Sequence, residues 1–174
     1  MTDTVTEPGI VEAMPLLARN EGVWEGWYRY YDTRTGKLID EHRSRLICRL
    51  ISDEKGERYH QTNHYFWPDG RTEVRDFPAD YRDGRIWWDN DLIKGWCAAM
   101  QPDDARRSSC LYWERKNEPG LYLYEMIQNN ADYTRRHRTW QWFQDGECYQ
   151  RTLIDEKLVT RDWRNFAGDA PPQD

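Results

Sequence analysis

The chain has 174 residues, a length that suits one domain with a single hydrophobic core. Its formal net charge of -6 argues against a nucleic-acid partner, because binding to phosphate backbones needs a concentrated positive surface. Aromatic residues make up 14% of the chain, with 10 Trp and 11 Tyr, and this content excludes an intrinsically disordered protein.

The two ends of the chain are polar, and we expect flexible tails at residues 1–8 and 167–174 around a single domain spanning 9–166. The first residues lack the basic and apolar regions of a signal peptide, and no run approaches the roughly 20 apolar residues of a membrane span. The four cysteines lie far apart without a C-x-x-C pair, so no zinc or thioredoxin-like site is expected. These features predict a cytoplasmic protein that does not contact a membrane.

A short helical segment is expected first. Apolar residues recur at helical spacing from Ile10 to Asn20, and Pro15 divides this segment because it removes a backbone donor. We therefore expect two short helical turns rather than one helix. After Gly22 the pattern alternates with period two, which is typical of strands. It predicts strands at residues 23–31, 41–51, 57–67, 71–77, 85–89, 94–100, 109–116, 121–128, 133–143 and 147–154, with a last short segment at 158–163.

Turn sequences separate these strands, among them Pro68-Asp69-Gly70, Asp83-Gly84 and Gln144-Asp145-Gly146. The connections are local, and no crossover helix is indicated between the strands. The pattern therefore predicts an all-β fold, an antiparallel up-and-down barrel with a short N-terminal helix. Barrels of this kind, lined by aromatic side chains, enclose small molecules.

The Gly22-Val23-Trp24 step follows the helical segment directly, and Arg161 and Arg164 come late in the chain. In this order the chain resembles the calycin superfamily, which includes the lipocalins. The resemblance implies a calycin-like barrel in which Trp24 closes one end and a late Arg packs across it. The signal peptide and paired cysteines of secreted lipocalins are absent, which argues against an extracellular carrier. Three blocks also resemble uncharacterised bacterial lipocalin-like proteins, a family label that carries no activity: Gln61–Tyr65, Tyr122–Met126 and Arg151–Glu156.

Glu125 is the first acid/base candidate, because it alternates with apolar residues on one strand face and burial would disfavour its charged form. Its expected partner is Arg138 or Arg136 in the next strand, and a purely structural ion pair is the alternative. Tyr124 points to the opposite side of a regular strand, so it would reach the same pocket only across a bulge. The full set of catalytic candidates is Glu125, His64, Tyr124, Arg138 and Asp89.

The expected ligand-binding residues combine aromatic rings with hydrogen-bonding groups, a mixture that suits an apolar ligand bearing oxygen atoms. They are Tyr28, Asn63, Tyr65, Trp88, Tyr122 and Trp140. His60 and His64 lie on one side of a strand but about 13 Å apart, too far to share a metal ion. One of them could act as an acid/base or haem ligand, and surface or barrel-wall positions are the alternative. No metal site is expected.

Different function classes stay open at this point. We favour a cofactor-independent lyase, isomerase or cyclase acting on a hydrophobic or aromatic metabolite, by analogy with phenolic acid decarboxylases, which work with Tyr, Glu and Arg in a lipocalin-like barrel. The alternative is a non-catalytic carrier of a hydrophobic ligand such as a terpenoid or haem, since one imidazole suffices as a haem ligand. A homodimer joined through Trp-rich strands is a third interpretation.

Overall fold

The computed structural model describes residues 8–168 and 170–172, so most of the expected tails, 1–8 and 167–174, lie outside the described residues or at their edge. The chain begins with α1 (Ile10–Ala13) and α2 (Pro15–Arg19). Pro15 occupies the first turn of α2, where its missing N–H needs no partner. The two short helical turns expected from Pro15 are therefore confirmed. Within the described residues, no helix has the length and apolar character needed to cross a membrane.

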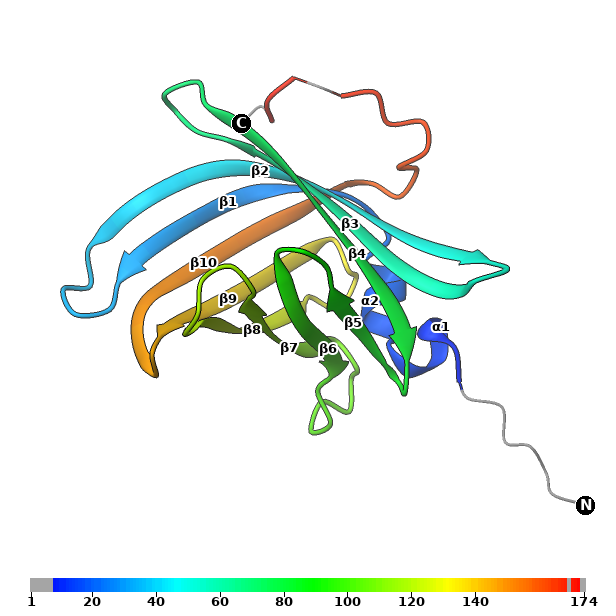
Figure 1. Cartoon of the computed structure of the whole chain (residues 1–174). Coiled ribbons are helices and arrows are strands. Elements are labelled where there is room, and N and C mark those ends of the chain that lie inside the picture. The colour runs from blue at the N-terminus through cyan, green and yellow to red at the C-terminus, as the bar shows by residue number, and fades with distance from the viewer. Residues whose placement is uncertain (1–7, 169, 173–174) are drawn as a thin grey trace, which may run out of the picture.

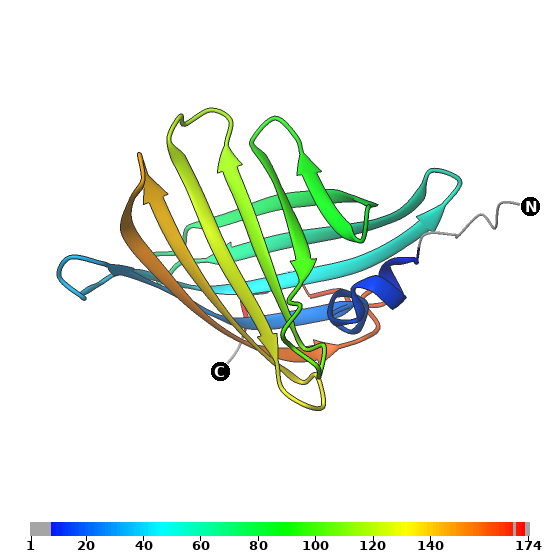
Figure 2. The same cartoon turned by 90° about the horizontal axis from the view of Figure 1, so that it is seen from below.

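The described residues contain ten antiparallel strands, which close into a barrel in simple up-and-down order (Figures 1 and 2). Each strand pairs with its neighbours in sequence, and β10 returns to pair with β1. The predicted all-β barrel is confirmed. Its strands are β1 (Gly22–Asp32), β2 (Leu38–Asp53), β3 (Gly56–Phe66), β4 (Thr72–Arg82), β5 (Arg85–Asp89), β6 (Ile93–Ala99), β7 (Ser108–Arg115), β8 (Leu121–Asn129), β9 (Arg135–Gln144) and β10 (Glu147–Thr160).

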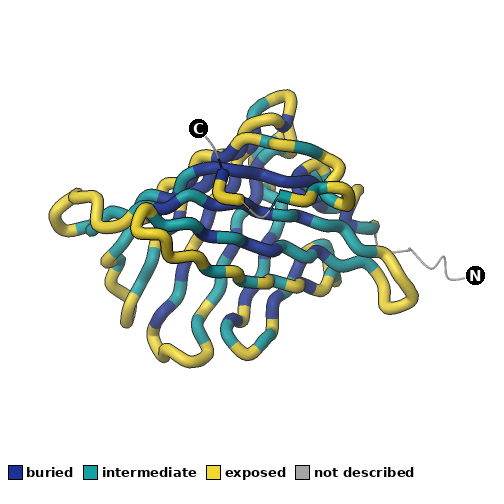
Figure 3. Tube along the Cα trace, turned by 90° about the horizontal axis from the view of Figure 1, so that it is seen from above, coloured by how far each residue is buried: buried dark blue, intermediate teal, exposed yellow. Residues whose placement is uncertain are grey.

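Strand β10 differs most from the prediction, because it runs without a break where two segments were expected. The charged run Asp155-Glu156-Lys157 does not interrupt it. Glu156 points inward and is 2% exposed, whereas its two neighbours point outward and are exposed. Alternation therefore continues through the charged run, and Figure 3 shows the same alternation of buried and exposed positions along other strands.

The helices lie at one end of the barrel (Figure 1). Their buried residues Ile10, Leu16 and Leu17 belong to the same core cluster as Trp24. The Trp24 side chain is fully buried, and its Nε1 donates a hydrogen bond to the Asn20 carbonyl at 2.8 Å. The Arg161 guanidinium lies 6.0 Å from the Trp24 ring centroid and donates to the Glu21 carbonyl at 3.1 Å. The closure expected around Trp24 is confirmed, and Arg161 rather than Arg164 provides the late Arg.

Strands β4 and β5 pair over a short stretch only, Asp80–Arg82 with Arg85–Trp87. Pro78 lies just beyond this stretch and has no N–H to donate to a neighbouring strand. The other side of β4 pairs continuously with β3, in a register that sets Glu73 opposite Tyr65 and Arg75 opposite Asn63. This register brings charged residues of β4 to the inner face beside the polar face of β3.

Candidate functional site

A cavity of about 400 Å³ lies inside the barrel. Its lining extends from Glu125 and Arg138, in the middle of their strands, to Glu118 in the hairpin between β7 and β8. The helices cover the other end, where the Ile10 backbone N–H donates to Glu57 Oε2 at 2.7 Å beside the β2–β3 hairpin. The aromatic part of the lining is Tyr30, Tyr65, Trp67, Phe77, Trp88, Trp113, Trp140, Trp142 and Tyr149.

The floor of the cavity is a buried ion pair. Arg138 Nε donates to Glu125 Oε1 at 2.5 Å, and the two side chains are 5% and 2% exposed. Arg138 Nη1 also donates to Tyr28 Oη at 3.0 Å and lies 3.5 Å from Glu156 Oε1. Behind it, Arg136 Nε donates to Glu156 Oε2 at 2.5 Å. Two carboxylates thus balance two guanidinium groups, which is the condition for keeping such charges away from water.

The protonation states of this floor follow from burial and pairing. Burial opposes the charge of Arg138, but Glu125, Tyr28 and Glu156 outweigh that cost and hold its pKa well above its ordinary value. Burial raises the pKa of Tyr28 well above its usual range. Tyr28 therefore stays protonated and Arg138 stays charged. In this geometry Glu125 accepts a charge-assisted hydrogen bond from Arg138, the structural arrangement that the sequence left open beside an acid/base role.

A second hydrogen-bonded pair, Tyr30 and His42, lies on the cavity wall. His42 Nδ1 is 3.1 Å from the Arg43 carbonyl oxygen, which can only accept a hydrogen bond, so Nδ1 carries the proton. Burial lowers the pKa of His42, so the ring is neutral near pH 7 and Nε2 has a free lone pair. Tyr30 Oη, at 3.1 Å, therefore donates to His42 Nε2. Burial also raises the pKa of Tyr30 above its usual range, which keeps the donating proton in place.

Several residues expected from the sequence meet at this cavity: Asn63, Tyr65, Trp88, Glu125, Arg138 and Trp140. Asn63 Nδ2 donates to Tyr65 Oη at 2.7 Å, so these two expected ligand-binding residues are already joined. Tyr28 is fully buried beneath the lining, where it contacts Arg138 and lies 5.3 Å, centroid to centroid, from the Trp140 ring.

Four other candidates lie away from the cavity lining and correct the expected site. Tyr124 is 52% exposed on the outer face, because β8 pairs on both sides without a bulge. Tyr122 shares that face and stacks on Phe143 at 4.9 Å. Asp89 is exposed, and its Oδ1 is 2.5 Å from Lys116 Nζ. His64 alternates with inward-facing residues of β3 and points to the outer side of the barrel.

The positions of the histidines also bear on the haem alternative, because the two candidate haem ligands, His60 and His64, do not face the cavity. His60 lies on the outer side with His64, and its Nε2 is 3.0 Å from Asp76 Oδ1. Of the histidines in the described part of the chain, His42 lines the cavity, and both of its nitrogens already have partners. A haem iron bound there would have to displace the Tyr30 hydrogen bond. Among the described residues, no three His, Cys, Asp or Glu side chains gather as a metal site.

His42 and Arg75 are lining residues that the sequence argument missed. Alternation along the strand could have identified His42. Every second residue of a strand lies on the same face, so His42 shares the face of Leu46 and Cys48. The signal for Arg75 was the register between β3 and β4, which sets it opposite Asn63. That register depends on a hairpin whose exact pairing the turn sequence alone does not determine.

Three hydrogen-bond donors in the lining are buried and have no acceptor among the described residues. They are Trp88 Nε1, Trp140 Nε1 and Arg115 Nε. Buried donors are nearly always paired in folded proteins, so these three are unusual, and a ligand atom or water that accepts from them would have to displace the side chains that cover them.

Comparison with known proteins identifies a similar fold but no activity. No protein-family model matches the chain, and no curated protein matches it. A solved structure from Nostoc punctiforme PCC 73102, a protein of unknown function from the DUF3598 family, superposes with a TM-score of 0.63 at 17% sequence identity. The match covers 82% of this chain and 49% of that one, so the chain corresponds to about half the length of that protein. At this identity the match shows a shared fold alone.

Proposed function

We propose that this protein binds a small aromatic or otherwise apolar molecule bearing oxygen atoms, inside a calycin-type barrel. The observation that carries the proposal is the pair of unpartnered indole N–H groups of Trp88 and Trp140 in the cavity lining. A buried donor without an acceptor costs about 1–3 kcal/mol, and a ligand oxygen that accepts from it recovers that free energy. The cavity volume of about 400 Å³ lies within the range of small-molecule sites.

Titration with Prodan, a neutral fluorescent naphthyl ketone, tests this proposal. We expect saturable binding with micromolar affinity, corresponding to about 8 kcal/mol, and a blue-shifted emission from an enclosed site. Trp88→Phe and Trp140→Phe keep the rings and remove the N–H donors, so each should weaken binding about 2- to 10-fold. Trp96→Phe is the matched control, because Trp96 stacks with Arg85 on the outer face. A failure of Prodan to bind saturably would remove the proposal.

The Tyr30–His42 pair favours a catalytic version of the same proposal, a cofactor-independent lyase, isomerase or cyclase. Tyr30 can exchange a proton with a bound molecule while His42 Nε2 takes up or returns the Tyr30 proton, so the pair works as an acid/base unit without a charged intermediate on Tyr30. The neighbouring Arg138 guanidinium, held in place by Glu125, would present a fixed hydrogen-bond donor to a developing oxyanion.

Hydrogen–deuterium exchange distinguishes the enzyme from a carrier. The methyl protons of 2-acetylnaphthalene exchange in D₂O when a base and an acid act on the bound ketone, and NMR measures the rate. An enzyme should accelerate this exchange, and Tyr30→Phe should reduce the acceleration about 10²–10⁴-fold while Prodan binding persists. Glu125→Gln reports on the competing assignment: a larger loss there than in Tyr30→Phe would make Glu125 the base. Binding without any acceleration would identify a carrier.

A further inference from the structure

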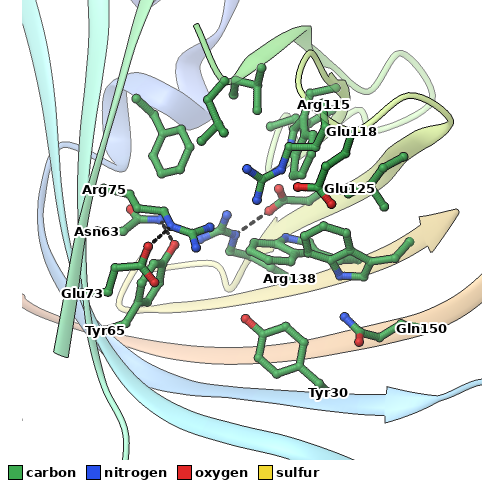
Figure 4. A pocket seen from close by; sticks show the side chains of 18 of the residues that line it. Tyr30, Asn63, Tyr65, Glu73, Arg75, Arg115, Glu118, Glu125, Arg138 and Gln150 are labelled. Atoms are coloured by element: carbon green, nitrogen blue, oxygen red, sulfur yellow. Dashed lines mark hydrogen bonds and ion pairs between the residues drawn. The ribbon is translucent and has the colours of Figure 1, made fainter. Parts of the chain in front are cut away.

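Two half-buried arginines, Arg75 from β4 and Arg115 from β7, line the cavity in addition to Arg138. Figure 4 shows them entering from different walls, Arg75 beside Asn63 and Tyr65, and Arg115 beside Glu118 and Glu125. Neither belongs to the buried floor. Both reach the volume that a ligand would fill.

The lining holds four carboxylates, those of Asp40, Glu73, Glu118 and Glu125, and three guanidinium groups, but no ion pair among the described residues includes Arg115. Glu125 neutralises Arg138, and Glu73 Oε1 accepts from Arg75 Nε at 2.6 Å. Arg115 forms no ion pair with a carboxylate of the described residues, and its Nε is buried without an acceptor. Glu118 is nearby but exposed at the rim. Arg115 is half-buried, and the carboxylates near it, Glu118 and Glu73, form no ion pair with it, so this position favours an added anion.

Arg75 leaves room for the same anion. Glu73 engages its Nε, and no described residue accepts a hydrogen bond from its two terminal nitrogens. Its guanidinium lies 5.8 Å from the Tyr65 ring centroid, so aromatic surface adjoins it. Burial, and after it the charge of Arg75, lower the pKa of Arg115 from its ordinary value, while Glu118 and Glu73 act in the opposite direction.

We infer that Arg75 and Arg115 form an anion subsite that binds the carboxylate of an aromatic or hydrophobic ligand whose apolar part lies against Trp88 and Trp140. This inference rests on the proposed function and narrows its ligand class to organic carboxylates. The planar guanidinium fork matches the two oxygens of a carboxylate, and the bound negative charge relieves the repulsion between the two cations.

A matched pair of compounds tests the subsite by calorimetry. 2-Naphthoate carries a carboxylate, and 2-acetylnaphthalene has the same rings with a neutral methyl ketone of similar size. In Arg115→Met we expect 2-naphthoate to bind about 10- to 100-fold more weakly, the effect of losing charge-assisted hydrogen bonds, while the ketone changes less than about twofold. Arg75→Met should act in the same direction, and Arg115→Lys should fall between, because Lys keeps the charge but loses the fork.

The control is Arg82→Met, which removes the same charge from an exposed residue stacked 4.8 Å from Trp87, outside the cavity. It should leave both affinities unchanged. Unchanged 2-naphthoate affinity in Arg115→Met, or equal weakening of both compounds, would overturn the subsite. 2-Acetylnaphthalene tests binding in the cavity independently of the subsite, because it carries no carboxylate. If it binds to the wild type, the proposed function still holds when the subsite is refuted. Binding of neither compound to the wild type would refute both proposals.

Discussion

The buried charges behind the cavity depend on one another, and Glu156→Gln is the most informative perturbation of the stability of the barrel. Glu156 serves both arginines of β9: its Oε2 accepts from Arg136 Nε at 2.5 Å, and its Oε1 lies 3.5 Å from Arg138 Nη1. The Glu156 side chain is 0% exposed and that of Arg136 is 2% exposed. The substitution keeps the shape and removes one negative charge, so Arg136 loses its carboxylate partner while Arg138 keeps Glu125.

The magnitude follows from this geometry. Two unit charges about 4 Å apart interact by about 4 kcal/mol at an effective dielectric constant near 20. Removing one partner of a buried pair typically costs about 3–5 kcal/mol, because the remaining charge stays desolvated. Gln can still accept a hydrogen bond from Arg136, so we expect a loss of about 3 kcal/mol in the free energy of unfolding. Replacing both partners, Arg136→Met with Glu156→Leu, should recover much of this loss, because no unpaired charge remains.

Urea unfolding followed by Trp fluorescence measures these differences. The control is Asp155→Asn, one residue away on the exposed face of the same strand, where the carboxylate is 59% exposed and lies 2.8 Å from His137 Nδ1. Its loss should not exceed about 1 kcal/mol, the usual range for surface pairs. A loss below about 1 kcal/mol for Glu156→Gln would refute the reasoning. The reasoning would also be refuted if the stability loss of the double variant equalled the sum of the losses of Arg136→Met and Glu156→Leu measured singly.

Three further outcomes follow from other groups. Because burial lowers the pKa of His42, the unfolded chain takes up a proton there before the folded chain does as the pH falls below about 6.5. The contribution of His42 to stability should therefore be constant well above that pH and decline below it, and the urea midpoint of His42→Gln should lack this decline. Burial raises the pKa of the Cys97 thiol to about 12. Maleimide should therefore label the half-exposed Cys110 in the folded protein and Cys97 only after urea unfolding, and equal labelling of the two in the folded protein would contradict the buried position of Cys97. A Cβ at Gly26 would collide with the Asp155 backbone carbonyl oxygen, so Gly26→Ala should lower the free energy of unfolding by about 3 kcal/mol or more, and an unchanged thermal midpoint would exclude this close approach.

The fold was predictable because alternation is a local property that survives along nearly every strand. Glu125 shares the inner face of β8 with Leu123 and Ile127, and Arg138 shares that of β9 with Trp140, so parity alone places both inside the barrel. The same rule places Tyr124 outside, and including it among the catalytic candidates required a bulge that β8 does not have. Strict alternation along β8 and β9 therefore gives the observed face of Glu125, Arg138 and Tyr124 alike.

The candidate site was harder to predict because it depends on relations between strands. Arg75 and Arg115 belong to strands 4 and 7, which are not neighbours, and nothing in either segment indicates that both reach one cavity. The Tyr30–His42 contact depends on the pairing of β1 with β2, where Tyr28 lies opposite His42. Local patterns give the face of a residue, but the partner across the barrel depends on the closed topology.

The position of each polar residue along the barrel axis then decides what a substitution can report. Arg136 and Arg138 are two residues apart on one strand face, yet Arg136 lies 4.6 Å from the Trp24 ring at the closed end, and Arg138 lines the cavity. Arg138 belongs both to the buried charge network and to the ligand volume, so its substitution changes stability and binding together. Arg115 has no described ion pair and belongs to the lining alone, so its substitution separates binding from folding. A carboxylate-specific loss in Arg115→Met with an unchanged urea midpoint is therefore stronger support for a ligand site than any loss seen at the Glu125–Arg138 floor.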